Sequence, residues 1–171
     1  MKRSIIFLAL FTLITLTFTA CEKRDYPGGL PEYENVYYAG FLPWNNTTTS
    51  SVPRTQTTLI KFPVEFHSVY VRDYDAVANY SLVSAGIAAP AIEGQDFVVT
   101  DKNGAALTSA AGKFSLVFPQ AKAKVDTIYL KVLNSAIPGT RKIEIDIIPN
   151  NGDQYSVHNF SQAYKRFLEV K

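Results

Sequence analysis

The sequence is poor in the residues that build disulfides, metal centres and catalytic sites. Its 171 residues include one cysteine and two histidines, His67 and His158. A single cysteine excludes an internal disulfide, and two histidines make no three-ligand zinc site without carboxylates. The sequence also has no nucleophile elbow, no zinc-protease helix motif and no phosphate-binding glycine loop. These absences argue against an enzyme, so we expect no catalytic residues, no metal and no cofactor.

The charges are few and nearly balanced. There are 17 basic and 15 acidic residues, and two of the basic ones are Lys2 and Arg3 in the first residues of the chain. No basic cluster is present, so we expect no nucleic-acid partner. In contrast, 47% of the residues are hydrophobic and 13% are aromatic, which is too apolar for a disordered chain and enough for one compact core.

Residues 1–20 have the pattern of a secretory signal peptide. A short basic start precedes an uncharged run, residues 5–20, which is too short and too rich in threonine for a transmembrane helix. Residues 18–21 (FTAC) resemble a bacterial lipobox, although Phe18 stands where an aliphatic residue is usual. The resemblance implies cleavage between Ala20 and Cys21 and acylation of the Cys21 thiol. The alternative is a buried or free cysteine at the end of an ordinary signal peptide.

An acylated Cys21 would make the membrane a partner of the mature protein. Two or more acyl chains anchor a protein firmly without spanning the bilayer. Residues 21–35 combine charged residues with proline and glycine and show no periodicity, so we expect a flexible tether. The predicted location is the cell envelope, on the outer membrane, with display at the cell surface.

The rest of the chain, residues 36–171, predicts a single all-β domain. Short apolar runs alternate with turn signals, and no stretch sustains a helical period. Residues 142–148 (KIEIDII) give the clearest strand, with Ile143, Ile145 and Ile147 inward. Residues 45–58 are expected to form a polar loop, while residues 68–72 (SVYVR) are expected to continue or pair with the preceding strand. The pattern favours an antiparallel Greek-key β-sandwich. Further strands are expected at residues 36–41, 58–66, 76–84, 97–99, 114–118, 127–133 and 164–170.

Residues 92–98 (IEGQDFV) resemble the signature of Calx-beta-like sandwiches, which belong to the immunoglobulin-like folds. Later strands in residues 112–118, 127–132 and 141–147 follow in the order of that family. Similar domains occur in Bacteroidetes lipoproteins that join a lipobox, a tether and one sandwich. Chemically, Gly94 permits a tight turn, Asp96 can bond nearby amides and Phe97 can close the core. The motif is therefore predicted to direct folding rather than catalysis.

Two groups of residues are candidates for ligand binding. Some Calx-beta domains bind calcium, and the resemblance makes Asp73, Asp75, Glu93 and Asp96 candidate ligands. Dense acidic tracts are missing, however, which favours carboxylates that are solvated or cap turns. Trp44, the only tryptophan, can stack on a sugar ring if it is exposed, or close one end of the core if it is buried.

The sequence therefore favours a non-catalytic binding or adhesion module of the cell envelope, with a glycan or an envelope or host protein as its ligand. The alternative is a structural accessory subunit of an outer-membrane assembly. A small hydrolase is the least favoured function. Exposure of Trp44 separates the first two, because an accessory subunit needs no exposed stacking ring.

Overall fold

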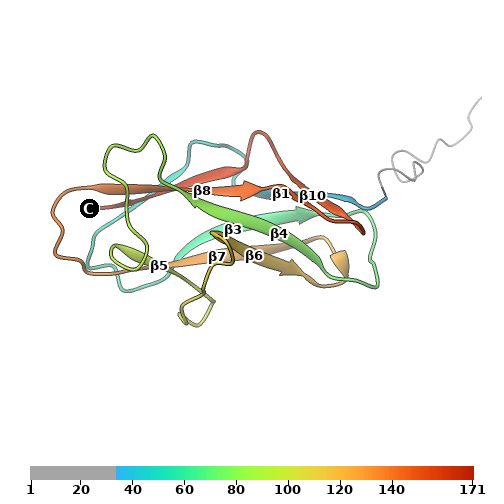
Figure 1. Cartoon of the computed structure of the whole chain (residues 1–171), viewed down its shortest axis with the longest axis horizontal. Coiled ribbons are helices and arrows are strands. Elements are labelled where there is room, and N and C mark those ends of the chain that lie inside the picture. The colour runs from blue at the N-terminus through green and yellow to red at the C-terminus, as the bar shows by residue number, and fades with distance from the viewer. Residues whose placement is uncertain (1–33) are drawn as a thin grey trace, which may run out of the picture. The chain divides into compact units, whose positions relative to one another are not determined.

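Alternating apolar residues fold the chain into two β-sheets that pack face to face (Figure 1). The computed structural model describes residues 34–171, and Asn35–Lys171 form one compact unit. The predicted signal peptide, Cys21 and almost all of the predicted tether lie outside the described residues. Within residues 34–171, no helix is long and apolar enough to cross a bilayer.

Sheet A has the strand order β5-β7-β3-β1-β10-β9, and sheet B has the order β2-β11-β8-β4-β6. The strands are β1 (Val36–Phe41), β2 (Thr49–Val52), β3 (Ile60–His67), β4 (Ala76–Val83), β5 (Phe97–Thr100), β6 (Lys113–Phe118), β7 (Lys124–Val132), β8 (Arg141–Ile148), β9 (Asn150–Asn151), β10 (Ser156–Asn159) and β11 (Lys165–Val170). One short 3-10 helix, η3 (Pro119–Ala121), joins β6 to β7.

The core lies between the sheets, where the predicted alternation places it. Ile143, Ile145 and Ile147 of β8 are buried, as are Ile128 and Leu130 of β7. The all-β sandwich is thus confirmed. Large aromatic side chains fill the remaining space, among them Tyr37, Phe41, Phe66, Tyr80, Phe97 and Phe118.

The sheets are mixed, which corrects the expectation of a wholly antiparallel sandwich. β1 pairs in parallel with β10, and β2 pairs in parallel with β11. The predicted polar loop at residues 45–58 therefore contains a strand. β2 was missed because its sequence, TSSV, offers only Val52 to the interior, so long-range pairing with β11 has to define it.

The predicted strand at residues 68–72 is wrong. β3 ends at His67, and the chain forms an irregular loop until β4 begins at Ala76. β9 and β10 were not predicted. β9 is only two residues long, and β10 buries a single apolar side chain, Val157.

The two ends of the sandwich carry different loops, on opposite sides of Figure 1. At the N-terminal end, Tyr74 Oη donates a hydrogen bond to Asn35 Oδ1 at 2.9 Å, so the loop between β3 and β4 meets the start of β1. At the C-terminal end, the Arg54 N–H donates to the Lys171 carbonyl at 2.9 Å, so the loop after β2 meets the last residue.

Candidate functional site

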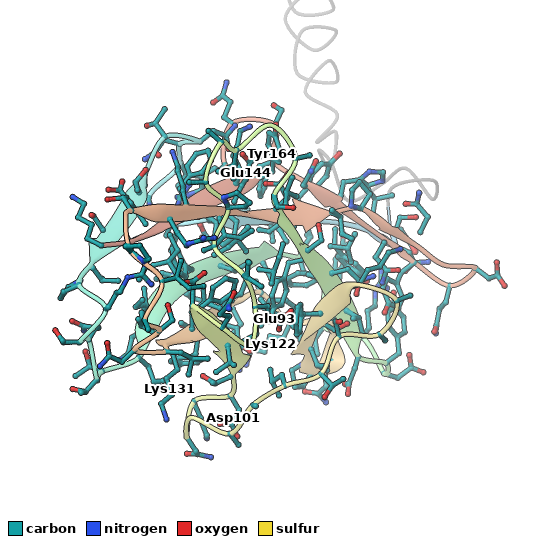
Figure 2. All side chains as sticks on the ribbon, turned by 60° about the vertical axis from the view of Figure 1, so that its left-hand side comes forward. Glu93, Asp101, Lys122, Lys131, Glu144 and Tyr164 are labelled. Carbon is teal, nitrogen blue, oxygen red and sulfur yellow. The ribbon has the colours of Figure 1, made fainter. Side chains whose placement is uncertain are left out.

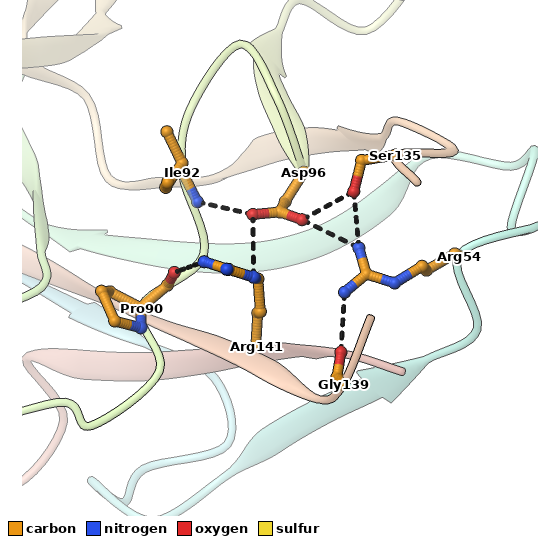
Figure 3. Close-up of polar contacts among 7 residues, drawn as sticks. All are labelled: Arg54, Pro90, Ile92, Asp96, Ser135, Gly139 and Arg141. Atoms are coloured by element: carbon orange, nitrogen blue, oxygen red, sulfur yellow. Dashed lines mark hydrogen bonds and ion pairs between the residues drawn. The ribbon is translucent and has the colours of Figure 1, made fainter. Parts of the chain in front are cut away.

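A buried carboxylate, Asp96, holds together the loops at the C-terminal end (Figure 3). Arg54 Nη1 donates to Asp96 Oδ1 at 2.8 Å, and the Ile92 N–H donates to Asp96 Oδ2 at 2.9 Å. Ser135 Oγ lies 2.9 Å from Oδ1, and Arg141 Nε lies 3.9 Å from Oδ2. Burial by itself raises the pKa of Asp96, but these donors and the positive charge of Arg141 outweigh it and lower the pKa.

The E-G-x-D-F segment thus acts as a folding motif, as the sequence predicted. Gly94 has a φ of +79°, which an L-residue with a Cβ rarely adopts. Phe97 is fully buried at the start of β5. Arg54 was not singled out from the sequence, because nothing in residues 45–58 indicates that its guanidinium reaches a carboxylate 42 residues away.

The structure does not bring the four candidate calcium ligands together. Asp73 and Asp75 precede β4 at the N-terminal end, whereas Glu93 and Asp96 precede β5 at the C-terminal end. Asp75 Oδ1 accepts the Gln120 N–H at 2.9 Å, which is a turn-capping role. Within residues 34–171, no three histidine, cysteine, aspartate or glutamate side chains gather as metal ligands.

Two open grooves flank the Asp96 network. The larger, of about 430 Å³, lies beside Arg54 and is otherwise lined by residues 55–57, Lys131, Val132 and Asn134. The smaller, of about 270 Å³, is mostly apolar and includes Glu93, whose pKa is raised by burial. The Arg54 guanidinium is already bonded to Asp96, Ser135 and Gly139, so it is committed to the network rather than free to bind an anion in the larger groove.

A second group of side chains, on the outer face of sheet A, gathers aromatic rings at the surface. Tyr38 of β1 lies between His67 of β3 and His158 of β10 in the strand register. Their neighbours Tyr37, Phe66 and Val157 are buried, so alternation turns Tyr38 and both histidines outward. We call Tyr38, Trp44, His67, His158 and Phe160 the aromatic patch.

Phe160 occupies the centre of the aromatic patch. Its ring stacks on Tyr38 with centroids 5.3 Å apart, and Trp44 meets it edge-on at 4.3 Å. The His67 ring lies 5.2 Å from Phe160 and 5.4 Å from Trp44. Such offset and edge-to-face contacts are favourable beyond the area that they bury. The rings therefore support one another as a single surface.

The exposed Trp44 side chain is held by contacts along one edge. Trp44 Nε1 donates to Glu65 Oε2 at 3.1 Å, and the other oxygen of Glu65 lies 3.3 Å from His67 Nε2. The buried guanidinium of Arg166 donates to the carbonyls of Pro43 and Asn45, on either side of Trp44. These contacts fix the backbone and one edge of the indole, so little side-chain freedom is left to lose on binding.

The interpretation of Trp44 as a core plug is wrong. The side chain is 44% exposed, and Tyr38 is 41% exposed. Phe41 does fill the core, and the buried cation of Arg166 lies 5.0 Å above its ring. The sequence signal for the patch was incomplete, because His158 and Phe160 lie in and after a strand that was not predicted.

The outer face of sheet B carries a carboxyl pair, Glu144 and Asp146 on β8. Glu144 points away from the core and lies 3.2 Å from Lys165 Nζ (Figure 2). Burial and the neighbouring Glu144 charge raise the pKa of Asp146 to about 7. Asp146 Oδ1 has no hydrogen-bond partner. Neither of the two grooves described above is lined by Glu144 or Asp146, so we do not consider this pair a ligand site.

Comparison with known proteins supports the fold alone. No protein-family model matches the sequence, and no curated protein matches it. The solved structure of the apo-form Calx CBD1 domain has a TM-score of 0.50 and 14% identity, covering 79% of this chain and 97% of that one. CBD12 from CALX1.2 has a TM-score of 0.49 at 14% identity, over 78% of this chain and 45% of that one. The cohesin CaCohA2 from Clostridium acetobutylicum has a TM-score of 0.41 at 15% identity, covering 81% and 92%.

Proposed function

We propose that this chain is a non-catalytic binding module, held in the cell envelope by a lipid on Cys21, with the aromatic patch as its ligand surface. The observation that carries the proposal is the exposed, fixed indole of Trp44 beside the exposed ring of Tyr38. A buried Trp44 would instead have favoured an accessory subunit that binds no ligand of its own.

Carbohydrate is the ligand class that the patch supports best. Flat rings at the surface can stack on the C–H faces of sugar rings, and nearby polar groups can bond the hydroxyls. Here the exposed rings of Trp44 and Tyr38 both contact Phe160, and Glu65, His67 and His158 lie around them. The combination of apolar faces and a polar margin matches a glycan better than a wholly apolar segment.

Intrinsic fluorescence gives a direct test, because Trp44 is the only tryptophan in the chain. Titration of the full chain with envelope polysaccharides and an oligosaccharide panel should shift or quench its emission. Tyr38→Ala should weaken binding at least about fivefold, since stacking of a nucleobase on an aromatic side chain contributes about 1–3 kcal/mol and we expect a sugar ring to lose a contact of similar size. Phe167→Ala, on the outer face of sheet B, is the matched control and should bind normally.

The outcomes separate the ligand classes. A response to no glycan, together with a patch-dependent crosslink to an envelope protein, would identify a protein ligand instead. A blank result in both arms would refute the binding proposal and leave the accessory subunit. Anchorage is tested separately, because Cys21→Ser should release the protein from the envelope fraction and abolish incorporation of labelled fatty acid.

A further inference from the structure

The loop between β3 and β4 exposes three consecutive apolar side chains. Val69, Tyr70 and Val71 are 72%, 42% and 59% exposed. We call these three residues the apolar loop. Runs of this kind are avoided on the surface of a soluble domain unless they meet a partner. The alternating valines that predicted a strand here are exposed to solvent and do not pack in the core.

The apolar loop is held in place by its neighbours. Ser68 Oγ donates to the Tyr70 carbonyl at 2.7 Å, and the Arg72 N–H donates to the Gln120 carbonyl of η3 at 2.7 Å. The Arg72 guanidinium also lies 5.2 Å above the Tyr70 ring. The loop therefore presents its side chains from a defined position.

That position is next to the point where the predicted tether joins the domain. Asn35 immediately precedes β1, and it accepts a hydrogen bond from Tyr74, three residues after the apolar loop. The 15 residues from Cys21 to Asn35 can span at most about 50 Å when fully extended. A lipid on Cys21 thus keeps this end of the sandwich within reach of the bilayer.

We infer that the apolar loop inserts into the interface of the bilayer that holds the lipid on Cys21, an inference that rests on the proposed anchorage. Tyrosine favours the headgroup level, and exposed valines gain by leaving water. Arg72 can bury its aliphatic stem while its charged head stays in water. The domain would then stand on its N-terminal end, with the Asp96 network away from the membrane.

The contact is apolar rather than electrostatic. Arg72 is followed by Asp73 and Asp75, so the loop carries no net positive charge to attract anionic lipids. Membrane contact should therefore be insensitive to ionic strength and to the anionic lipid content. This separates the apolar loop from the basic segments that bind membranes by charge.

Cysteine labelling of the full chain tests the inference, because acylation consumes the thiol of the only native cysteine. Val69→Cys and Val71→Cys each introduce one free thiol in the apolar loop. Ala88→Cys introduces one in an exposed loop at the C-terminal end and is the matched control. Each purified lipidated variant is placed in vesicles of phosphatidylethanolamine and phosphatidylglycerol, opened by freezing and thawing, and treated with a polar maleimide.

The thiols at positions 69 and 71 should react about tenfold more slowly than the thiol at position 88, and detergent should remove the difference. Equal rates in vesicles would overturn the inference. Protection in native envelopes but not in pure lipid would also overturn it, because a protein would then cover the loop. Fractionation of Cys21→Ser tests the lipid anchor by itself, and the maleimide rates test insertion of the apolar loop. Failure of the anchorage proposal and failure of this inference therefore give different results. Melting temperatures confirm that each variant folds.

Discussion

Phe160 lies across Gly40, and the pair determines the shape of the aromatic patch. A Cβ on Gly40 would lie 2.7 Å from Phe160 Cδ2, closer than real side chains approach. Gly40 faces outward on β1 between Tyr38 and the segment that leads to Trp44. The absence of a side chain at this position lets Phe160 support the rings on both sides.

Gly40→Ala should disrupt the patch more than the fold. The new methyl group displaces Phe160 at a cost of about 1–3 kcal/mol, partly offset because alanine is favoured over glycine in strands. Trp44 emission should move to longer wavelength, and glycan affinity should fall about two- to tenfold, because an aromatic pair contributes about 0.5–1.5 kcal/mol. In a Phe160→Ala background the same substitution should cost almost no stability. An equal cost in both backgrounds would show that the clash is not the cause.

Asp96→Ala should destabilise the domain by about 3–5 kcal/mol, because it leaves two arginine side chains without their carboxylate. Urea unfolding at pH 7 measures the loss. Asp101→Ala is the control, since Asp101 is only partly buried and caps only its own turn after β5 (Figure 2). A loss at Asp96 no greater than the loss at Asp101 would contradict the role assigned to the buried network.

The same carboxylate should contribute to acid sensitivity. The pKa of Asp96 is lower in the folded state than in the unfolded chain, so the unfolded chain binds more protons as the pH falls. The stabilisation is present above the unfolded pKa and is lost as the pH falls through the folded pKa. Asp96→Asn should therefore flatten the loss of stability below about pH 4.

Asp146 should act in the opposite direction. Its pKa rises from 3.8 to about 7 on folding, so the folded state binds the extra proton between those values. Stability from this group is greatest below pH 4 and declines as the pH approaches and passes 7. Asp146→Asn should raise the melting temperature at pH 8 relative to the parent and change it little at pH 4. A uniform shift at both values would show that protonation is not involved.

Calcium should leave the melting temperature unchanged. The candidate ligands lie at opposite ends of the sandwich, and both oxygens of Asp96 already accept hydrogen bonds. Thermal unfolding and calorimetry with millimolar calcium, with magnesium as the control, measure the effect. A calcium-specific rise of several degrees would reveal a loop arrangement other than the one described here.

Sequence patterns predicted the structure correctly where neighbouring residues in the sequence decide which side chains are buried. Strict alternation predicted β8 and its inward isoleucines, and the glycine and aspartate of residues 92–98 predicted a turn with a buried anchor. Alternation gave a wrong strand prediction at Val69 and Val71. Two apolar residues separated by one position suggest a buried face, but they do not show that a second sheet packs against that face. Only the structure shows these residues outside the sheets.

The candidate site was harder to predict because its parts meet through strand register. Tyr38, His67 and His158 come from three strands, and β10 lacks the apolar pattern of a strand. Arg166 is likewise an inward position in an apolar alternation, which hides its role in holding the backbone around Trp44. Arg166 lies on the same inward face as Leu168 and Val170, so the alternation predicts that its side chain is buried. The alternation does not identify the carbonyl groups that accept its hydrogen bonds.

The parallel pairing of the first two strands with the last ones has a consequence for folding. β1 is completed by β10 and β2 by β11, and β11 also separates β2 from β8. Sheet A is therefore complete only when β10 has been made, and sheet B only when β11 has been made; each parallel pair joins segments more than a hundred residues apart. Such distant closures make folding slow. In a nascent chain, sheet B would lack a strand until β11 has been synthesised. Deletion of residues 166–171 should remove the pairing partner of β2 and destabilise that edge of the sheet before it affects β4 and β6.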